Sequence, residues 1–143
     1  MYPDIVHAVF AGGAWKLAQR DVWMLSFGSN ESDAFVAERI VKYYRFDKQC
    51  FVRRPGPTMS YWLVGESSPV GSIMGEDCTS FDPGKIEAGS IAGRESIIDG
   101  GVSLFDFRDH SEATQALQII KYYNFTHLCF VGRQTFEMVY LRR

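Results

Sequence analysis

Three cysteines are the residues of this 143-residue chain whose spacing bears most directly on covalent chemistry. Cys50 and Cys129 each precede Phe-Val in a short apolar run, where cysteine usually serves as a small core residue. Cys78 lies apart, in Gly-Glu-Asp-Cys. In an oxidising compartment we expect a Cys78–Cys129 disulfide, with Cys78–Cys50 as the alternative, and in a reducing compartment three free thiols. Because Cys-x-x-Cys spacing is lacking, neither a structural zinc site nor a thioredoxin-like site is indicated.

Acids and a histidine come together in Asp106-Phe-Arg-Asp109-His110, and these residue types could form the acid–base pair of a small hydrolase. The stretch also ends a predicted strand and starts a predicted helix, where such residues commonly act as solvated caps. The chain has no Gly-x-Ser-x-Gly elbow. Its glycine pairs lack the helix and lysine of a phosphate loop and predict hairpin bends. We therefore expect no catalytic residues, no metal and no cofactor.

Tryptophan and arginine near a Pro-Gly turn are typical of a platform for a carbohydrate or a peptide, because the flat ring stacks and the guanidinium donates directed hydrogen bonds. Arg54 and Trp62 flank such a turn. Because strand side chains alternate, Trp62 should lie on the face opposite Tyr61, which is assigned to the core. The alternative is that the rings cover the gap between helix and sheet, and that the arginines bind backbone carbonyls. The predicted ligand-binding residues are Arg54, Trp62, Trp15 and Arg133.

An internal duplication underlies these placements. Residues 34–62 align without a gap on residues 113–141 with 13 identities in 29 positions, counted directly along the chain. About one or two would arise by chance. The identities include Lys-Tyr-Tyr and Cys-Phe-Val in both copies. We predict a single domain, 1–143, made of repeat 1 (1–64), a joint rich in Gly, Ser and Pro (65–84) and repeat 2 (85–143).

Each repeat is predicted to contain one helix, because apolar residues recur at three- and four-residue spacing from Ala34 to Tyr44 and from Ala113 to Tyr123. Asn30 and Asp109 are the predicted caps. Alternating or short apolar runs predict four strands in each repeat. The predicted strands are Ala14–Ala18, Val22–Phe27, Gln49–Arg53 and Met59–Val64, then Glu95–Ile98, Val102–Phe107, Leu128–Gly132 and Glu137–Leu141. The expected fold is α+β, with two β-β-α-β-β modules about a pseudo-twofold axis, roughly eight strands and two main helices.

Charge and hydropathy narrow the class of partner. A formal net charge of −2 provides no basic field for phosphate backbones, so nucleic acid is not an expected partner. No apolar run approaches the ~20 residues of a membrane span, and the N-terminus lacks a charged region followed by an apolar stretch. We expect a soluble domain without membrane insertion. Its compartment is left open, and secretion or a place in the cell envelope within a larger protein is compatible with the sequence.

The order Leu25-Ser-Phe-Gly-Ser, a helix with paired alanines, Cys-Phe-Val-Arg and a further strand resembles the SPOR module of bacterial envelope proteins. That family is a small βαββ domain that binds the glycan strands of peptidoglycan. The resemblance implies a glycan or cell-wall ligand and carries over no individual binding residue.

The leading hypothesis is a non-catalytic module that recognises a glycan or a protein surface, since duplication supplies two similar sites without new chemistry. The alternative is a structural or assembly domain whose exposed hairpin edges pair with another chain, for example in a homo-oligomer. A small hydrolase using Asp106, Asp109 and His110 is the third hypothesis.

Overall fold

The structure is a computed structural model that describes residues 1–53, 59–132 and 137–143. Within these ranges the fold is α+β, with two α-helices and eleven strands in four small antiparallel sheets. The elements before the joint are β1 (Val6–Ala11), β2 (Ala14–Gln19), β3 (Val22–Ser26), α1 (Glu31–Tyr44), β4 (Lys48–Phe51) and β5 (Ser60–Leu63), after a 3-10 turn at Pro3–Ile5. The joint contains β6 (Asp77–Ser80). The same order then recurs as β7 (Glu87–Ile91), β8 (Arg94–Asp99), β9 (Val102–Phe107), α2 (His110–Tyr123), β10 (His127–Val131) and β11 (Met138–Arg142).

The expected count of eight strands is wrong, because β1, β6 and β7 were not predicted. β7 reads Glu-Ala-Gly-Ser-Ile and β6 reads Asp-Cys-Thr-Ser, so neither has the apolar alternation that marks a strand in sequence. Each forms because a neighbouring strand supplies its hydrogen bonds: β8 pairs with β7, and β10 with β6. Positive φ at both Gly12 and Gly13 builds the tight turn from β1 to β2, which confirms the predicted hairpin bend.

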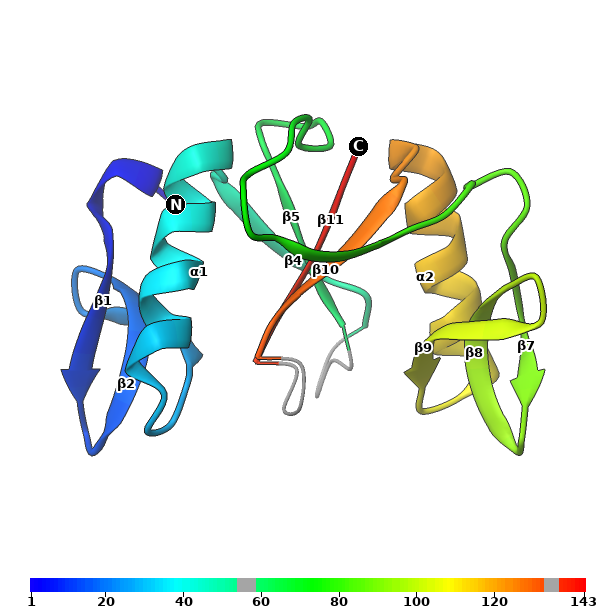
Figure 1. Cartoon of the computed structure of the whole chain (residues 1–143), viewed down its shortest axis with the longest axis horizontal. Coiled ribbons are helices and arrows are strands. Elements are labelled where there is room, and N and C mark those ends of the chain that lie inside the picture. The colour runs from blue at the N-terminus through cyan, green and yellow to red at the C-terminus, as the bar shows by residue number, and fades with distance from the viewer. Residues whose placement is uncertain (54–58, 133–136) are drawn as a thin grey trace.

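Each helix covers one face of a three-stranded outer sheet, α1 over β1-β2-β3 and α2 over β7-β8-β9 (Figure 1). The paired alanines, Ala34 with Ala37 and Ala113 with Ala116, are fully buried, because their small side chains let helix and sheet approach closely. Both predicted caps are confirmed. Asn30 accepts a hydrogen bond from the Asp33 amide, and Asp109 accepts one from the Glu112 amide.

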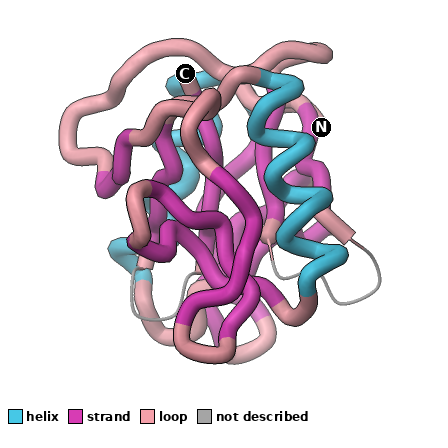
Figure 2. The backbone as a smooth tube through the Cα atoms, turned by 90° about the vertical axis from the view of Figure 1, so that its right-hand side faces the viewer, coloured by secondary structure: helices cyan, strands magenta, loops and turns pink. Residues whose placement is uncertain are grey.

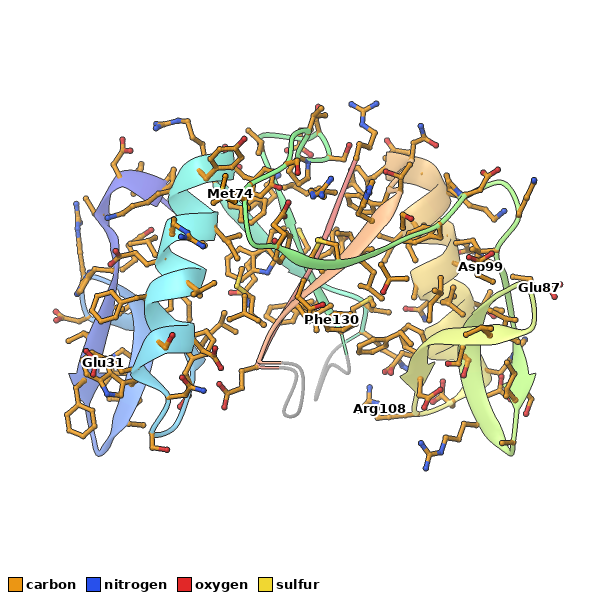
Figure 3. All side chains as sticks on the ribbon, in the orientation of Figure 1. Glu31, Met74, Glu87, Asp99, Arg108 and Phe130 are labelled. Carbon is orange, nitrogen blue, oxygen red and sulfur yellow. A yellow bond between two sulfur atoms is a disulfide. The ribbon has the colours of Figure 1, made fainter. Side chains whose placement is uncertain are left out.

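The two central hairpins, β4-β5 and β10-β11, lie between the helices (Figure 1), with β5 beside β11. Strands β5, β10 and β11 are therefore buried on both faces, whereas β4 is half-buried. Tyr61 and Leu63 belong to the core that contains the buried face of α2, whereas Trp62 belongs to the core that contains α1. In the other hairpin Phe130 points toward the α2 side (Figure 3) and stacks on Phe105, with ring centroids 6.5 Å apart.

Trp62 must therefore be corrected as a ligand-binding residue. The predicted alternation along β5 holds, but both faces of the strand are core, and the Trp62 side chain is 0% exposed. It stacks on Phe46 with ring centroids 5.6 Å apart. A ring enclosed in this way offers no face to a ligand, so Trp62 fills the space between the central hairpin and α1.

The joint crosses over the central strands from the α1 side to the α2 side (Figure 1). Its first part is tied to the C-terminal residue, whose amide donates to the Pro69 carbonyl at 2.9 Å. Its last part is β6, which pairs antiparallel with β10, and a disulfide links Cys78 to Cys129 in this pair. Both termini lie toward the same end of the molecule (Figures 1 and 2).

Among the described residues, neither helix has the length and apolar character required to cross a bilayer.

Candidate functional site

A buried carboxylate, Glu76, anchors the joint to the central strands. The hydroxyls of Tyr44 and Tyr140 donate to its Oε2 at 2.7 and 2.5 Å, and the Ile73 amide donates to Oε1 at 3.0 Å. Arg142 completes the arrangement with an ion pair at 3.0 Å. The side chains of Glu76 and Arg142 are only 4% and 8% exposed. The joint therefore binds to the rest of the molecule through an acid that is fully hydrogen-bonded.

These contacts determine the protonation states. Burial by itself would raise the pKa of Glu76, but the hydrogen bonds from Tyr140, Tyr44, Ile73 and Arg142 outweigh burial and lower that pKa. Burial and the nearby carboxylate raise the pKa of both tyrosines, so their hydroxyls remain donors. One Glu76 oxygen and the sulfurs of Cys78 and Cys129 lie within 4.8 Å of one another. The set does not suit a metal ion, because the disulfide engages the sulfurs and Arg142 already supplies the positive charge.

The rings around Glu76 have a counterpart on the other side of the central strands. We call Tyr43, Tyr44, Phe46 and Tyr140 the first tyrosine cluster, and Tyr122, Tyr123, Phe125 and Tyr61 the second tyrosine cluster. Ring centroids of Tyr44 and Phe46 are 5.4 Å apart, and those of Tyr123 and Phe125 are 5.5 Å apart. Tyr44 lies 6.0 Å from Tyr140, and Tyr123 lies 6.0 Å from Tyr61. Each cluster joins one helix to the hairpin of the other half.

Hydrogen bonds tie the joint to the tyrosines of the first cluster. Met74 of the joint lies beside the C-terminal end of α1 (Figure 3), and the Tyr43 hydroxyl donates to the Ser72 carbonyl at 2.9 Å. Tyr43 is 51% exposed, whereas Tyr122, at the same place in the second cluster, is 81% exposed. The second cluster is therefore the more accessible of the two.

The outer edges of the two central hairpins also differ in how far they are covered. β10 pairs with β11 on one side and β6 on the other, and its residues from Leu128 to Val131 are buried. β4 pairs with β5 in the same register as β10 with β11: Cys50 lies opposite Tyr61, and Cys129 opposite Tyr140. In the described part of the chain, β5 is the single strand neighbour of β4, and all four β4 residues are only half-buried. At the edge of β4 away from β5, the described residues place no strand, whereas β10 holds β6 at the corresponding edge.

A cavity of about 380 Å³ lies beside the start of β4. On β10, the equivalent stretch is in contact with the joint, because Thr79 and Ser80 pair with Leu128 and His127, and the Phe81 amide donates to the Thr126 carbonyl at 2.8 Å. The cavity therefore borders the residues of β4 that correspond to the part of β10 paired with the end of β6. Its lining residues are Met1, Gln19, Val22, Met24, Asp47, Lys48 and Gln49.

Cys50 is the free cysteine of the chain. It lies in the middle of β4 opposite Tyr61, at the position that Cys129 has in β10. Burial raises the pKa of the thiol, while a hydrogen bond with Tyr61 and the charge of Lys48 act in the opposite direction. Burial, with Cys50 and Tyr123 nearby, raises the pKa of Tyr61 to about 12. Cys50 is thus a protonated thiol at neutral pH, and it is only partly covered.

The structure describes one of the three remaining predicted ligand-binding residues, Trp15. Arg54 and Arg133 lie outside the described residues. Trp15 lies on β2 between two exposed rings, 5.6 Å from Phe10 and 5.7 Å from Phe35, and it is half-buried against the α1 core. We call these three side chains the Trp15 surface.

The residues of the hydrolase hypothesis are held apart by separate interactions. His110 contacts Glu95, Nδ1 to Oε2, at 3.0 Å. Asp109 caps α2 and forms an ion pair with Arg53 at 2.9 Å. Asp106 accepts from Ser96 at 2.6 Å, and its pKa is lowered chiefly by that bond. Each acid therefore has a partner other than His110.

Sequence reasoning did not identify Glu76, Tyr61 and Tyr123 as members of a site. A signal was present, since the Lys-Tyr-Tyr run that occurs twice in the sequence supplies the helix tyrosines of both clusters. The open edge of β4 had no signal, because it depends on which strand lies beside it in space.

No protein-family model, curated protein or solved structure matches the chain.

Proposed function

We propose that the protein is a duplicated, non-catalytic binding module, with its repeats related by a pseudo-twofold axis, that binds an extended segment of another polypeptide along β4. The element order β-β-β-α-β-β, which occurs on each side of the joint, supports the duplication, as do the matching ring distances in the two tyrosine clusters. In this function the protein assembles with another polypeptide, and a strand of that partner pairs with the edge of the sheet.

The observation that carries the proposal is β6 on β10. There a short polar strand of the chain itself pairs with β10, the strand that corresponds to β4. The tyrosine cluster beside each of the two strands has the same distance between its helix tyrosine and its hairpin tyrosine, 6.0 Å. In strand addition, main-chain hydrogen bonds supply affinity and pockets for alternate side chains supply specificity. β4 offers both, with an open edge for the main chain and the cavity and second cluster for side chains.

Charge near the edge does not prevent this pairing. Native proteins often protect an edge strand with lysine, and Lys48 lies at the start of β4. Its ion pair with Glu66 involves side chains that are 44% and 84% exposed, so the pair contributes little and is readily exchanged. Lys48 is therefore available to an acidic group on an incoming strand.

The test uses a peptide with the sequence of residues 72–82 and serine in place of cysteine, added to the full chain with its disulfide intact. We expect saturable binding, with amide NMR shifts in residues 47–51 and around Tyr123 and none in β7 or β8. Methylating alternate peptide nitrogens provides the control, because methyl groups on one edge of a paired strand should abolish binding and those on the other edge should not. Absence of binding, or equal effects of both methylated series, contradicts the proposal.

Glycan binding at the Trp15 surface is the second candidate. Its rings are exposed, and a hollow of about 300 Å³ beside them is lined by Ser32, Phe35, Val36 and Arg39, which combines a stacking face with a guanidinium. In β7-β8 the pair corresponding to Phe10 and Trp15 is Ser90 and Glu95, so this sheet forms without the rings.

Peptidoglycan is the first glycan to test, given the resemblance to SPOR modules. We expect tryptophan fluorescence to report saturable binding that Trp15→Ala removes while Trp23→Ala, in the neighbouring strand, retains it. Equal affinity of the Trp15→Ala variant and the parent protein would exclude this surface.

A further inference from the structure

We infer that the strand accepted by β4 carries a cysteine opposite Cys50, and that the two are joined by thiol–disulfide exchange. The inference rests on the proposed function, because it requires a strand at that edge. It specifies the chemistry of the partner: an extended polypeptide segment with a cysteine, preceded two residues earlier by a hydrogen-bond acceptor.

The position of the cysteine follows from the register of β6 on β10. Cys78 lies opposite Cys129, and the two form the disulfide. Cys50 occupies the place of Cys129, opposite a tyrosine on the returning strand in both hairpins. A strand that paired with β4 in the same register would therefore place one residue directly opposite Cys50. A cysteine at that residue reproduces the bond that the chain already makes.

The acceptor follows from the tyrosine clusters. Glu76, two residues before Cys78, accepts from Tyr44 and Tyr140. Tyr123 and Tyr61 hold the same relative positions in the second cluster, so their hydroxyls can serve the residue two before the partner cysteine. The second cluster differs from the first in one respect: Leu63 of β5 has the position that Arg142 has in β11. Without that cation a neutral amide is accommodated as well as a carboxylate, and the expected residue is Gln or Glu.

The exchange is balanced if the partner cysteine arrives as a mixed disulfide with a small thiol. The Cys50 sulfur attacks the partner cysteine sulfur, and the new bond joins these two atoms as the old S–S bond breaks. The small thiol leaves with the electron pair and takes up the proton that Cys50 lost. No additional oxidant is needed. Because burial raises the pKa of the Cys50 thiol, the rate should increase with pH through the neutral range.

The experiment uses the peptide of residues 72–82 with its cysteine activated as a 2-thiopyridyl disulfide. Release of pyridine-2-thione measures the rate, and intact mass followed by peptide mapping locates the adduct. We expect a single adduct on Cys50 that forms at least tenfold faster than with a scrambled activated peptide. Replacing the peptide glutamate by glutamine should retain that advantage, and replacing it by alanine should reduce it several-fold. The Cys50→Ser variant should form no adduct.

The outcomes separate the two proposals. If the serine peptide binds at β4 but the activated peptide reacts no faster than its scrambled form, the cysteine inference is wrong and strand binding stands. If the serine peptide does not bind, the proposed function itself is wrong. A disulfide-linked dimer through Cys50 that forms in preference to the peptide adduct would also overturn the inference, because a second copy of the chain would then be the occupant.

Discussion

Glu76 is the residue at which the joint, α1 and β11 meet. Its carboxylate accepts hydrogen bonds from two tyrosine hydroxyls, one main-chain amide and one guanidinium, and its side chain is 4% exposed. An acid in this position stabilises the fold only while it is charged, because Arg142 beside it is buried and needs a counter-charge. The stability of the whole joint is therefore coupled to the ionisation of one side chain.

This coupling predicts a pH dependence. The pKa of Glu76 is lower in the folded protein than the value of about 4.3 for an unfolded chain, so its contribution is complete above that value and is lost as pH falls through the folded pKa. Glu76→Gln should cost about 3 kcal/mol at pH 7, since it leaves Arg142 unpaired. Urea unfolding from pH 7 to pH 3 should show the difference between variant and parent decreasing below pH 4. A difference independent of pH would contradict the assignment.

At the scale of elements, β6 shows that a strand can depend on tertiary contacts more than on its own sequence. It contains one residue that favours strands, Thr79, and one that disfavours them, Asp77, and it is held by β10, by the disulfide and by the Glu76 contacts just before it. The joint is consequently part of the core structure, although its Gly, Ser and Pro content is typical of a linker.

The disulfide closes a long loop, with a sequence separation of 51 residues between its cysteines. Restricting a loop of that length in the unfolded chain stabilises the fold by about 4 kcal/mol. We expect the double variant Cys78→Ser, Cys129→Ser to lose most of this in urea unfolding, and to show faster hydrogen exchange in the joint. Cys50→Ser is the matched control and should change stability little. Equal unfolding midpoints for the two variants would show that the crosslink contributes nothing.

For the molecule as a whole, the important feature is that the halves share their cores. The core beneath α2 contains Met59, Tyr61 and Leu63 from the first half, and the core beneath α1 contains Met138 and Tyr140 from the second. Neither half encloses its own hydrophobic surface. Folding should therefore be cooperative across the chain.

Separate fragments 1–66 and 67–143 provide the test. Each should expose one face of its hairpin, lack a cooperative thermal transition alone and regain one when the two are mixed. Circular dichroism melts of each fragment and of the mixture measure this. A fragment that unfolds cooperatively as a monomer would show that its half is independent.

The elements themselves were largely predictable from local patterns. The spacing of Ala34 and Ala37, with Asn30 as cap, placed α1, and the α+β class followed from helix and strand periodicities. Trp62 was misplaced because period-two alternation shows that two faces exist and does not show whether the second one is covered.

The sequence by itself determined the helices, their caps and most of the strands, because these depend on residues a few positions apart. Tertiary structure alone decided that Trp62 is core, that Glu76 and Arg142 form a buried pair, and that Cys129 has a partner strand while Cys50 faces an open edge. The physical reason is that burial and strand pairing depend on which distant segment occupies the adjacent space. Cys50 and Cys129 have the same local sequence, Cys-Phe-Val, and only their neighbours distinguish them.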